Sequence, residues 1–502
     1  METLFFPLII AIPVAAAPII YLTGRFGWRL GNPWLEKLSG WLCVEAFVVS
    51  AIFLALAIHQ YSLSGPQTFM VEAIALRFDG LSMLTAIVAV GLGGLVALYS
   101  LAYMEGEAGA EKYYAMLAVM VGVMVGLGCA GDLFNLWVWF EAMAVSSYLL
   151  VAFYRNQPAS LEAGVKYLVQ SATGSVLVLL GIALVFAQTG TLSLDQIRSS
   201  IPASPMMLAA GALFVIGFGV KVAMVPMHTW LPDAHSQAPS GISAMLSGIV
   251  IEAGLVALLR ALSSLAGITL SWGVLLMGFG ALNMLAGNLL ALRQKQVKRL
   301  LAFSSLSHVG YMLLGLGIAV YVGQSAGAEG GFFHLLNHGL MKGLAFLAAG
   351  ALMYVLYIAK GDHTSPLTIS DLSGTVKRYP VIALTLSIAV LGLGGLPPLA
   401  GFMSKWQIFV AGFATQNTAI DLLVIFAALN SVLSLAYYAP LVNAVYREQP
   451  SEAVLAGKPL PITMSLPLLA MALAIVVIGV WPSLLQGLTG PAGAALVKAF
   501  GG

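Results

Sequence analysis

About fourteen apolar stretches, each long enough to span a membrane, follow one another along the chain. A helix needs about 20 mostly apolar residues to cross a bilayer. In lipid the backbone must satisfy its own hydrogen bonds, so such stretches predict helices. The sequence is 60% hydrophobic and 8% charged, whereas a soluble domain carries about 25% charged residues. We predict an all-α integral membrane protein with spans at 3–23, 39–58, 79–103, 113–130, 133–153, 163–187, 207–229, 237–262, 271–292, 300–322, 331–356, 380–411, 419–445 and 463–486.

Basic residues between the predicted spans indicate the orientation. Cytoplasmic loops of membrane proteins carry an excess of lysine and arginine. With the N-terminus outside, fourteen of the 22 lysines and arginines, Lys298 among them, fall in cytoplasmic loops. Four, Arg260 among them, fall in outer segments, and four fall within spans. The first apolar stretch follows Glu2 without a basic segment, so we interpret it as a span and not as a signal peptide. We expect a single membrane domain over residues 1–502, with both termini outside a bacterial or archaeal cytoplasmic membrane.

Four lysines lie within the predicted spans: Lys166, Lys221, Lys342 and Lys405. A lysine inside a bilayer costs roughly 3 kcal/mol or more, and it persists mainly where it lines a polar path. Two of these lysines share their span with proline: Pro226 follows Lys221, and Pro397 precedes Lys405. A lysine beside a broken membrane helix, occurring twice, indicates an ion path.

The two proline-interrupted spans are the seventh and the twelfth of the series. They lie five helices apart, and because five is odd, the two units would have opposite orientations in the membrane. Inverted repeats with paired broken helices build midplane ion sites in many transporters. We predict two inverted five-helix repeats with helices 7 and 12 broken. The predicted parts are helices 1–3 (3–103), the first repeat (113–262), the second repeat (271–445) and the last helix (463–486).

Glu141 lies in the middle of the fifth span without a charged neighbour in its own segment. A lone carboxylate there would be neutral, and Lys221 is the obvious counter-ion. A buried Glu–Lys pair titrates as a unit. If Glu141 is drawn to another cation, Lys221 gives up its proton, and it takes one back when the pair re-forms. The alternative is a static ion pair. Lys166 either joins this cluster or extends to the membrane surface.

His334, His338 and Lys342 are spaced four residues apart, so they share one helix face. A column of titratable groups on one face forms a proton path. Two histidines at this spacing also bind zinc in some proteins, but the glutamate of an H-E-x-x-H motif is absent here. We therefore predict a proton path and no metal.

Four further titratable residues are considered with this path. Glu252 is in the middle of the eighth span, where we interpret it as a proton carrier. His308 in the tenth span either extends the path or is a core residue with satisfied hydrogen bonds. His228 and His235 flank the WLP turn at the end of the seventh span, and they either line the cytoplasmic mouth of a half-channel or cap that turn.

Motifs for cofactor chemistry are absent from the sequence. It has no P-loop, no C-x-x-C and no G-x-G-x-x-G leading into a soluble βαβ unit. Cys43 and Cys129 lie in apolar segments and are interpreted as small core residues. No basic run indicates nucleic acid. We predict no cofactor and no redox chemistry in this chain itself.

At these positions the chain resembles the antiporter-like subunits shared by complex I and the Mrp-type multi-subunit cation/proton antiporters. The matching segments are RFDGLSML (77–84), YSLAYM (99–104), GDLFNLWVWFE (131–141), KVAMVPMHTWLPDAHSQAPSGISAML (221–246), VKRLLAFSSLSHVGYM (297–312), HLLNHGLMKGLAFLAAG (334–350) and GLPPLAGFMSKW (395–406). The resemblance implies fourteen helices with two inverted repeats. It also implies a proton path along the membrane midplane. In the family this path is formed by a glutamate on the fifth helix, a lysine on the seventh and a lysine or glutamate on the twelfth, and those roles fall on Glu141, Lys221 and Lys405.

The sequence departs from the pattern of this family in two places. Glu252 stands where the eighth helix usually has lysine or histidine, and Gln296 and Val297 stand where an aspartate usually precedes KRLLA. The first departure leaves the sign of the central charge open, with Lys342 as an alternative basic member. The resemblance also places the chain among the medium-sized subunits. Its VWFE segment favours the Mrp D subunit and hydrogenase-linked relatives, while the remaining motifs do not separate these from complex I.

The sequence therefore predicts a proton-translocating antiporter-like subunit of a larger membrane complex of complex I or Mrp type. Protons would enter beside the seventh and eighth helices, pass Lys221, Glu252 and Lys342 to Lys405, and leave outward. The expected partners are other membrane subunits, including related antiporter-like subunits, together with protons and the lipid bilayer; transport of Na+ is left open. The alternatives are a subunit of a redox-independent Na+/H+ antiporter, an antiporter-like subunit of a membrane-bound hydrogenase, and a structural scaffold.

Overall fold

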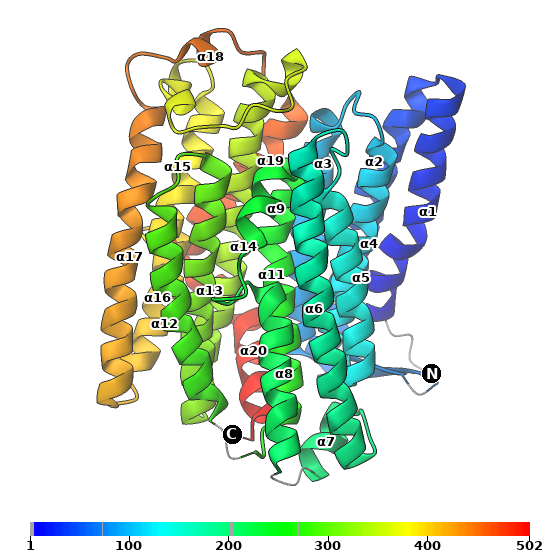
Figure 1. The fold of residues 1–502 in the computed structure, drawn as a ribbon, viewed down its shortest axis with the longest axis vertical. Helices are drawn as coiled ribbons and strands as arrows, with labels where there is room; N and C mark the ends of the chain where they lie inside the picture. Colours follow the sequence, from blue (N-terminus) through cyan, green and yellow to red (C-terminus); the bar gives the residue numbers. More distant parts are fainter. Residues whose placement is uncertain (1–4, 73, 201–203, 269–270, 502) are drawn as a thin grey trace.

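The computed structural model describes residues 5–72, 74–200, 204–268 and 271–501. Within these ranges, 13 helices are long and apolar enough to cross a membrane, or up to 14 if the bent pair Ser370–Lys377 and Pro380–Gly394 forms one span. The long helices run side by side along the long axis of the molecule (Figure 1). The predicted all-α membrane fold is confirmed.

The main helices were largely anticipated by the apolar stretches. In chain order they are α1 (Phe6–Leu30), α2 (Pro33–Ser64), α3 (Gly80–Tyr103), α4 (Ala110–Gly128), α5 (Leu133–Val151), α6 (Pro158–Thr189), α7 (Leu194–Ser200), α8 (Pro205–Val222), α9 (Leu231–Gln237), α10 (Ser240–Met245), η1 (Leu246–Val250), α11 (Ile251–Ser264), α12 (Trp272–Ala291), α13 (Val297–Val322), α14 (Ser325–Leu356), α15 (Pro380–Gly394), α16 (Ala400–Phe413), α17 (Thr418–Val445), α18 (Glu452–Leu455), α19 (Ile462–Val480) and α20 (Gln486–Ala499).

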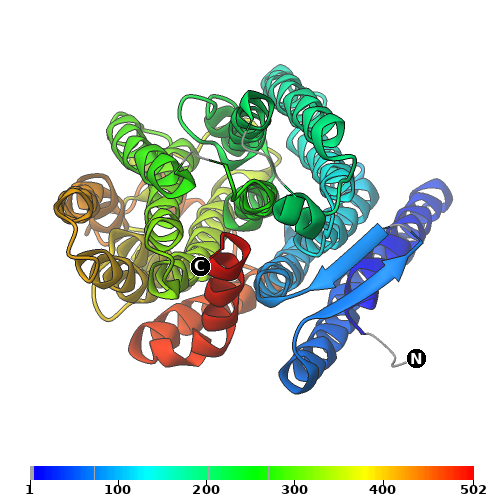
Figure 2. The ribbon, with the colours of Figure 1, turned by 90° about the horizontal axis from the view of Figure 1, so that it is seen from below.

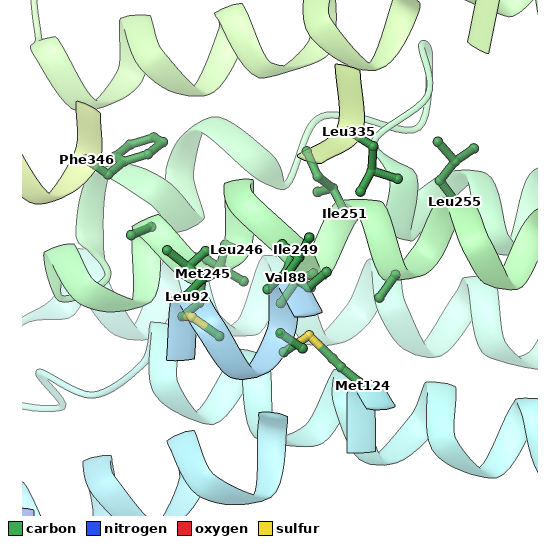
Figure 3. Packing of buried hydrophobic residues seen from close by; sticks show 14 of the residues in the cluster. Val88, Leu92, Met124, Met245, Leu246, Ile249, Ile251, Leu255, Leu335 and Phe346 are labelled. Carbon is green, nitrogen blue, oxygen red and sulfur yellow. The ribbon is translucent and has the colours of Figure 1, made fainter. Parts of the chain in front are cut away.

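The innermost helix is the composite α10–η1–α11. Its apolar window is 100% buried, whereas that of α17 at the periphery is 28% buried. Figure 3 shows Val88 and Leu92 of α3 packed beside Leu246 and Ile249 of the π-helical turn η1. A polar residue on this helix is therefore shielded from both lipid and bulk water by protein.

Helix 7 is broken between α8 and α9. Ala223 has a left-handed φ of 57°, and the backbone leaves the helix there. Asn283 of α12 supplies bonds to the break: its Oδ1 accepts from Val225 N at 2.8 Å and its Nδ2 donates to Ala223 O at 3.3 Å. Irregular backbone at membrane depth requires such internal partners.

Helix 12 is broken between α15 and α16. Gly395 has φ 82°, a conformation that glycine adopts at little cost. Lys221 lies in the last turn before the first break, and Lys405 lies after the second break, within α16. Both predicted breaks are confirmed. The division of the chain into inverted repeats stays a prediction.

Several short elements were not predicted. A two-stranded antiparallel hairpin, β1 (Gln67–Val71) and β2 (Ile74–Phe78), lies at one end of the bundle beside α1 and α2 (Figure 2). The short helix α7 and the last helix α20 lie at the same end. The first turn of α1 and the last turn of α20 both point toward this end. The side of the membrane that the two termini face stays a prediction.

Candidate functional site

Glu252 lies at the start of α11, directly after the π-helical turn η1. Such turns are rare and are frequent at functional sites. Glu252 Oε1 lies 2.7 Å from His338 Nδ1 of α14, and both side chains are fully buried. Glu252 Oε2 and His338 Nε2 are buried without a hydrogen-bond partner among the described residues. The pair therefore has an open acceptor on one side and an open ring nitrogen on the other.

The close approach of α10–η1–α11 and α14 depends on two glycines. A Cβ added at Gly248 would lie 2.5 Å from Leu92 Cδ2 and 3.1 Å from Gly339 O, and one added at Gly339 would lie 2.8 Å from Gly248 O. Contacts below 3.0 Å are not compatible with ordinary packing, so larger residues would push the helices apart. These glycines hold Glu252 beside His338.

Three histidines form a cluster next to this pair. His308 of α13 contributes Nδ1, which lies 3.0 Å from His334 Nε2, and its ring centroid is 5.2 Å from that of His338. His334 Nδ1 lies 2.9 Å from Ser404 Oγ of α16. The predicted column on α14 is thus joined by His308 and continues to the residue before Lys405.

Lys405 is 3% exposed and lies beside the second broken helix. Its Nζ donates to Leu393 O at 2.9 Å and to Ser431 Oγ at 2.8 Å. The same Nζ lies 4.7 Å from the centre of the Tyr311 ring. Leu393 is at the C-terminal end of α15, where unpaired carbonyls favour a cation. The break therefore supplies the site that holds this lysine.

Lys221 lies in an aromatic pocket at the first broken helix. Its Nζ donates to Tyr167 Oη at 2.8 Å and lies 4.5 Å from the centre of the Tyr167 ring. The Tyr167 ring stacks on Trp230 with centroids 4.0 Å apart and planes 4° apart. Trp230 in turn donates to Val220 O at 2.7 Å, which fixes the stack to α8.

Glu141 of α5 lies within electrostatic range of Lys221. Among the described residues the two do not form an ion pair within 4.0 Å. Glu141 is partly exposed, and its Oε1 is buried without a hydrogen-bond partner among the described residues. In this state the Tyr167 hydroxyl, and not the carboxylate, binds the lysine.

Lys342, the third member of the α14 column, is fully buried. Its Nζ donates to Leu301 O at 2.7 Å and to the Ser304 hydroxyl of α13. It thus lies one turn beyond His338 and is bound by α13. The contact between His308 and His334 also joins α13 to α14.

Lys166 lies at the surface, away from this cluster. Its side chain is 47% exposed and pairs with Glu162 at 2.7 Å and with Asp233 at 3.0 Å. Arg299 also binds Asp233, at 2.6 Å. Of the two alternatives for Lys166, its position favours the surface. His228 lies in the turn after the first break, partly exposed, with Nδ1 lacking a hydrogen-bond partner among the described residues.

Sequence reasoning missed the hydroxyl groups that hold the lysines, namely those of Tyr167, Ser304 and Ser431. Serine and tyrosine are common in membrane helices and carry no spacing signal that marks them. It also placed Lys298 in a loop. In the structure α13 begins at Val297, so Lys298 lies in the first turn of this helix, and it is 5% exposed.

Arg260 also differs from its expected position in an outer segment. It is buried in α11, and its Nη2 lies 2.9 Å from Asp79 Oδ1 at the start of α3. The same nitrogen donates to Gly128 O. The pair fixes α11 to the ends of α3 and α4, because a buried cation needs both a counter-ion and hydrogen bonds.

The arrangement brings groups that exchange protons close together. Carboxylate, imidazole and amine groups follow one another across α11, α14, α13 and α16, all buried. Among the described residues no group of three or more His, Cys, Asp or Glu side chains is placed to hold a metal ion. Intramembrane titratable residues of this kind mark ion and proton pathways.

Comparison with known families gives two matches. The family described as NADH:quinone oxidoreductase/Mrp antiporter, TM, matches residues 130–434. The family described as NADH-Ubiquinone oxidoreductase (complex I), chain 5 N-terminus, matches residues 69–114. Together they cover most of the helical bundle and all of the titratable cluster.

Individual relatives extend the match to nearly the full chain. The F(420)H(2) dehydrogenase subunit N of Methanosarcina mazei is 31% identical over 478 residues, 93% of this chain and 94% of the relative. A chain of an archaeal membrane-bound sulfane sulfur reductase superposes with a TM-score of 0.86 at 29% identity, covering 98% of both chains. A chain of the Mrp complex from Dietzia sp. DQ12-45-1b has a TM-score of 0.84 at 22% identity and covers 99% of both chains, which shows the same fold.

Proposed function

Because this chain belongs to the NADH:quinone oxidoreductase/Mrp antiporter family of membrane subunits, we propose that it translocates protons through its buried titratable cluster. Its structural neighbours are chains of multi-subunit membrane complexes, and in this proposal it is an antiporter-like subunit that assembles with other membrane subunits. The path runs from Glu141 and Lys221 through Glu252 and the histidines to Lys405.

The observation that carries this proposal is the chain of short contacts between four helices. Glu252 and His338 are 2.7 Å apart, His308 and His334 are 3.0 Å apart, and His334 and Ser404 are 2.9 Å apart. Each contact joins groups that exchange protons, and none of the acid or imidazole groups is exposed. A purely structural role would not require so many ionisable groups at such cost in lipid.

Lys221 is the start of this relay. It is held by the neutral Tyr167 hydroxyl, while Glu141 lies within electrostatic range. Movement of Glu141 toward Lys221 would stabilise its charged form, and movement away would favour release of the proton. A neighbouring subunit that attracts Glu141 therefore drives transfer toward Glu252. Lys221 packs closely against α11, the helix that carries Glu252. A Cβ added at Gly254 of α11 would lie 3.0 Å from Lys221 Cγ.

The experiment is proton transport by the intact complex carrying Glu141→Gln or Lys221→Ala. We expect both variants to assemble and to lose transport, because each removes the group that changes charge at the start of the path. The measurement is proton uptake by inverted membrane vesicles, together with the amount of assembled complex. Wild-type transport in either variant would refute the proposal.

A further inference from the structure

A cavity with an excess of basic side chains lies at the end of the bundle that carries the hairpin. Its volume is about 610 Å³, within the roughly 300–1,000 Å³ of ordinary ligand sites. Strand β2 and the helices α7, α11 and α20 contribute to it, and Figure 2 shows the hairpin and α20 at this end. Its charged lining residues are Arg77, Asp79, Asp195, Arg198, Arg260 and Lys498. None of them belongs to the path proposed above.

The two carboxylates of the cavity are bound by its arginines. Asp79 accepts from Arg260 at 2.9 and 3.2 Å, and Asp195 accepts from Arg198 at 2.9 Å. Arg77 lies between the two carboxylates, with Nε 3.5 Å from Asp79 Oδ2 and Nη1 3.2 Å from Asp195 Oδ2. Three arginines therefore share two negative charges, which leaves one positive charge without a counter-ion in the lining.

Lys498 adds a second such charge. It is exposed in the last turn of α20, and among the described residues it has no carboxylate within 4.0 Å. The helix that carries it packs directly on the start of α3, because a Cβ added at Gly80 would overlap Pro491. The lining thus has four cationic and two anionic side chains. Such an excess of one charge in a cavity with apolar walls concentrates ions of the opposite sign.

The arginines also keep unused hydrogen-bond donors beside the cavity. Among the described residues, Nε of Arg198 and Nε of Arg260 are buried without a hydrogen-bond partner. Arg260 is only 7% exposed. Nearly all buried polar atoms in native proteins have a partner, so two unpartnered guanidinium donors at one cavity are unexplained by packing alone. The guanidinium fork matches the oxygens of a phosphate group.

The cavity lies at the depth of lipid headgroups. Its charged residues surround the points where α3 begins, at Gly80, and where α11 ends, at Ser264. The polar headgroup region of a bilayer lies just beyond the hydrocarbon core that the spans cross. Leucine and alanine side chains line much of the rest of the cavity, among them Leu81, Leu259 and Leu496. The lining therefore offers contacts both to an anionic group and to an apolar chain attached to it.

From these contacts we propose that the cavity binds a phosphate group, with Arg198 and Lys498 as its main cationic partners. Arginine binds phosphate through its planar fork, and lysine binds it as a point charge. A phospholipid headgroup and free phosphate share this chemistry, and the apolar part of the lining favours the lipid. Arg77 and Arg260 hold the two carboxylates in place. The site does not depend on proton translocation, so it would stand if the proposed function were wrong.

Direct binding to the whole purified complex in detergent tests the site. The probes are radiolabelled phosphatidylglycerol, given in micelles with a large excess of phosphatidylcholine that occupies unspecific lipid contacts, and radiolabelled inorganic phosphate. Lys498→Gln and Arg198→Gln each remove one positive charge from the cavity. We expect each variant to weaken saturable binding roughly fivefold, the effect of one basic residue on an anionic headgroup.

Arg447→Gln is the matched control for these variants. Arg447 is exposed between α17 and α18, at the other end of the bundle. The substitution removes the same charge from the chain, so binding should equal that of the wild type. The amount of assembled complex should be the same for all three variants, which separates loss of binding from loss of folding.

The outcomes decide both the site and the source of the phosphate. Saturable binding of phosphatidylglycerol that both cavity variants weaken assigns the site to a lipid. The same result with inorganic phosphate alone assigns it to free phosphate. The proposal is overturned if neither probe binds saturably, or if the cavity variants weaken binding no more than Arg447→Gln does. Transport by Glu141→Gln bears only on the proposed function and leaves this site untouched.

Discussion

The buried lysines share a mode of binding that bears on what they do. Lys221 is held by the Tyr167 hydroxyl, Lys342 by Ser304 and a carbonyl, and Lys405 by Ser431 and a carbonyl. A carboxylate in direct contact would stabilise the charged amine strongly. Neutral oxygens stabilise it less, which suits the proposed function, in which each lysine would exchange its proton in response to a charge that moves nearby.

At the residue scale, His338→Gln tests the link between Glu252 and the other histidines. Glutamine retains an N–H donor for Glu252 Oε1 but cannot take up and release a proton. We expect proton uptake to fall roughly 100-fold or more, with normal assembly of the complex. The measurement is uptake by vesicles, normalised to the amount of complex.

The matched control for this change is His59→Gln. His59 is exposed on α2, away from the cluster. It should transport at the wild-type rate. Equal transport by the two variants would mean that His338 carries no protons.

At the scale of elements, the breaks in two helices and the contact between two others create the site. The broken helix 7 places Trp230 on Tyr167, and the broken helix 12 exposes the carbonyl that binds Lys405. The glycine contact between η1 and α14 brings Glu252 to His338. The backbone carbonyls freed at the breaks therefore accept hydrogen bonds from the side chains of the site, such as Lys405.

Gly248→Ala tests that contact. Its added methyl would lie 2.5 Å from Leu92 Cδ2 and 3.1 Å from Gly339 O, so the Leu92 side chain must move and the contact with α14 becomes tight. Overpacking of this kind costs about 1–3 kcal/mol. We expect a lower melting temperature of the purified complex and slower proton uptake.

Gly278→Ala serves as the comparison, since a Cβ there has nothing within 4 Å. It should leave transport unchanged, and alanine should stabilise α12 by up to about 1 kcal/mol. If Gly248→Ala behaves in the same way, the glycine contact does not position Glu252.

At the scale of the whole molecule, the polar cluster is central and the periphery is apolar. Peripheral helices such as α2 and α17 are only 33% and 28% buried in their apolar windows. Leu429 and Val432 of α17 are 64% and 65% exposed. Such faces require either lipid or the helices of neighbouring subunits.

We expect an affinity-tagged chain, solubilised in mild detergent, to co-purify with other membrane subunits. Mass spectrometry of the isolated complex then distinguishes the candidate assemblies. Iron–sulfur or flavin subunits indicate a redox complex, and small membrane subunits alone indicate a cation/proton antiporter. Isolation of this chain by itself, with full transport activity in liposomes, would contradict the assignment as a subunit.

The sequence by itself determined the spans, the two breaks, and the presence of Glu252, three histidines and lysines at membrane depth. These features are local, because hydropathy, proline and four-residue spacing are properties of a single segment. Only the tertiary structure decided that Lys166 lies at the surface, that Lys298 is buried, and that Tyr167 rather than Glu141 binds Lys221. Contacts between helices depend on how each helix is rotated and how closely it approaches its neighbours, and those depend on packing between residues far apart in the sequence.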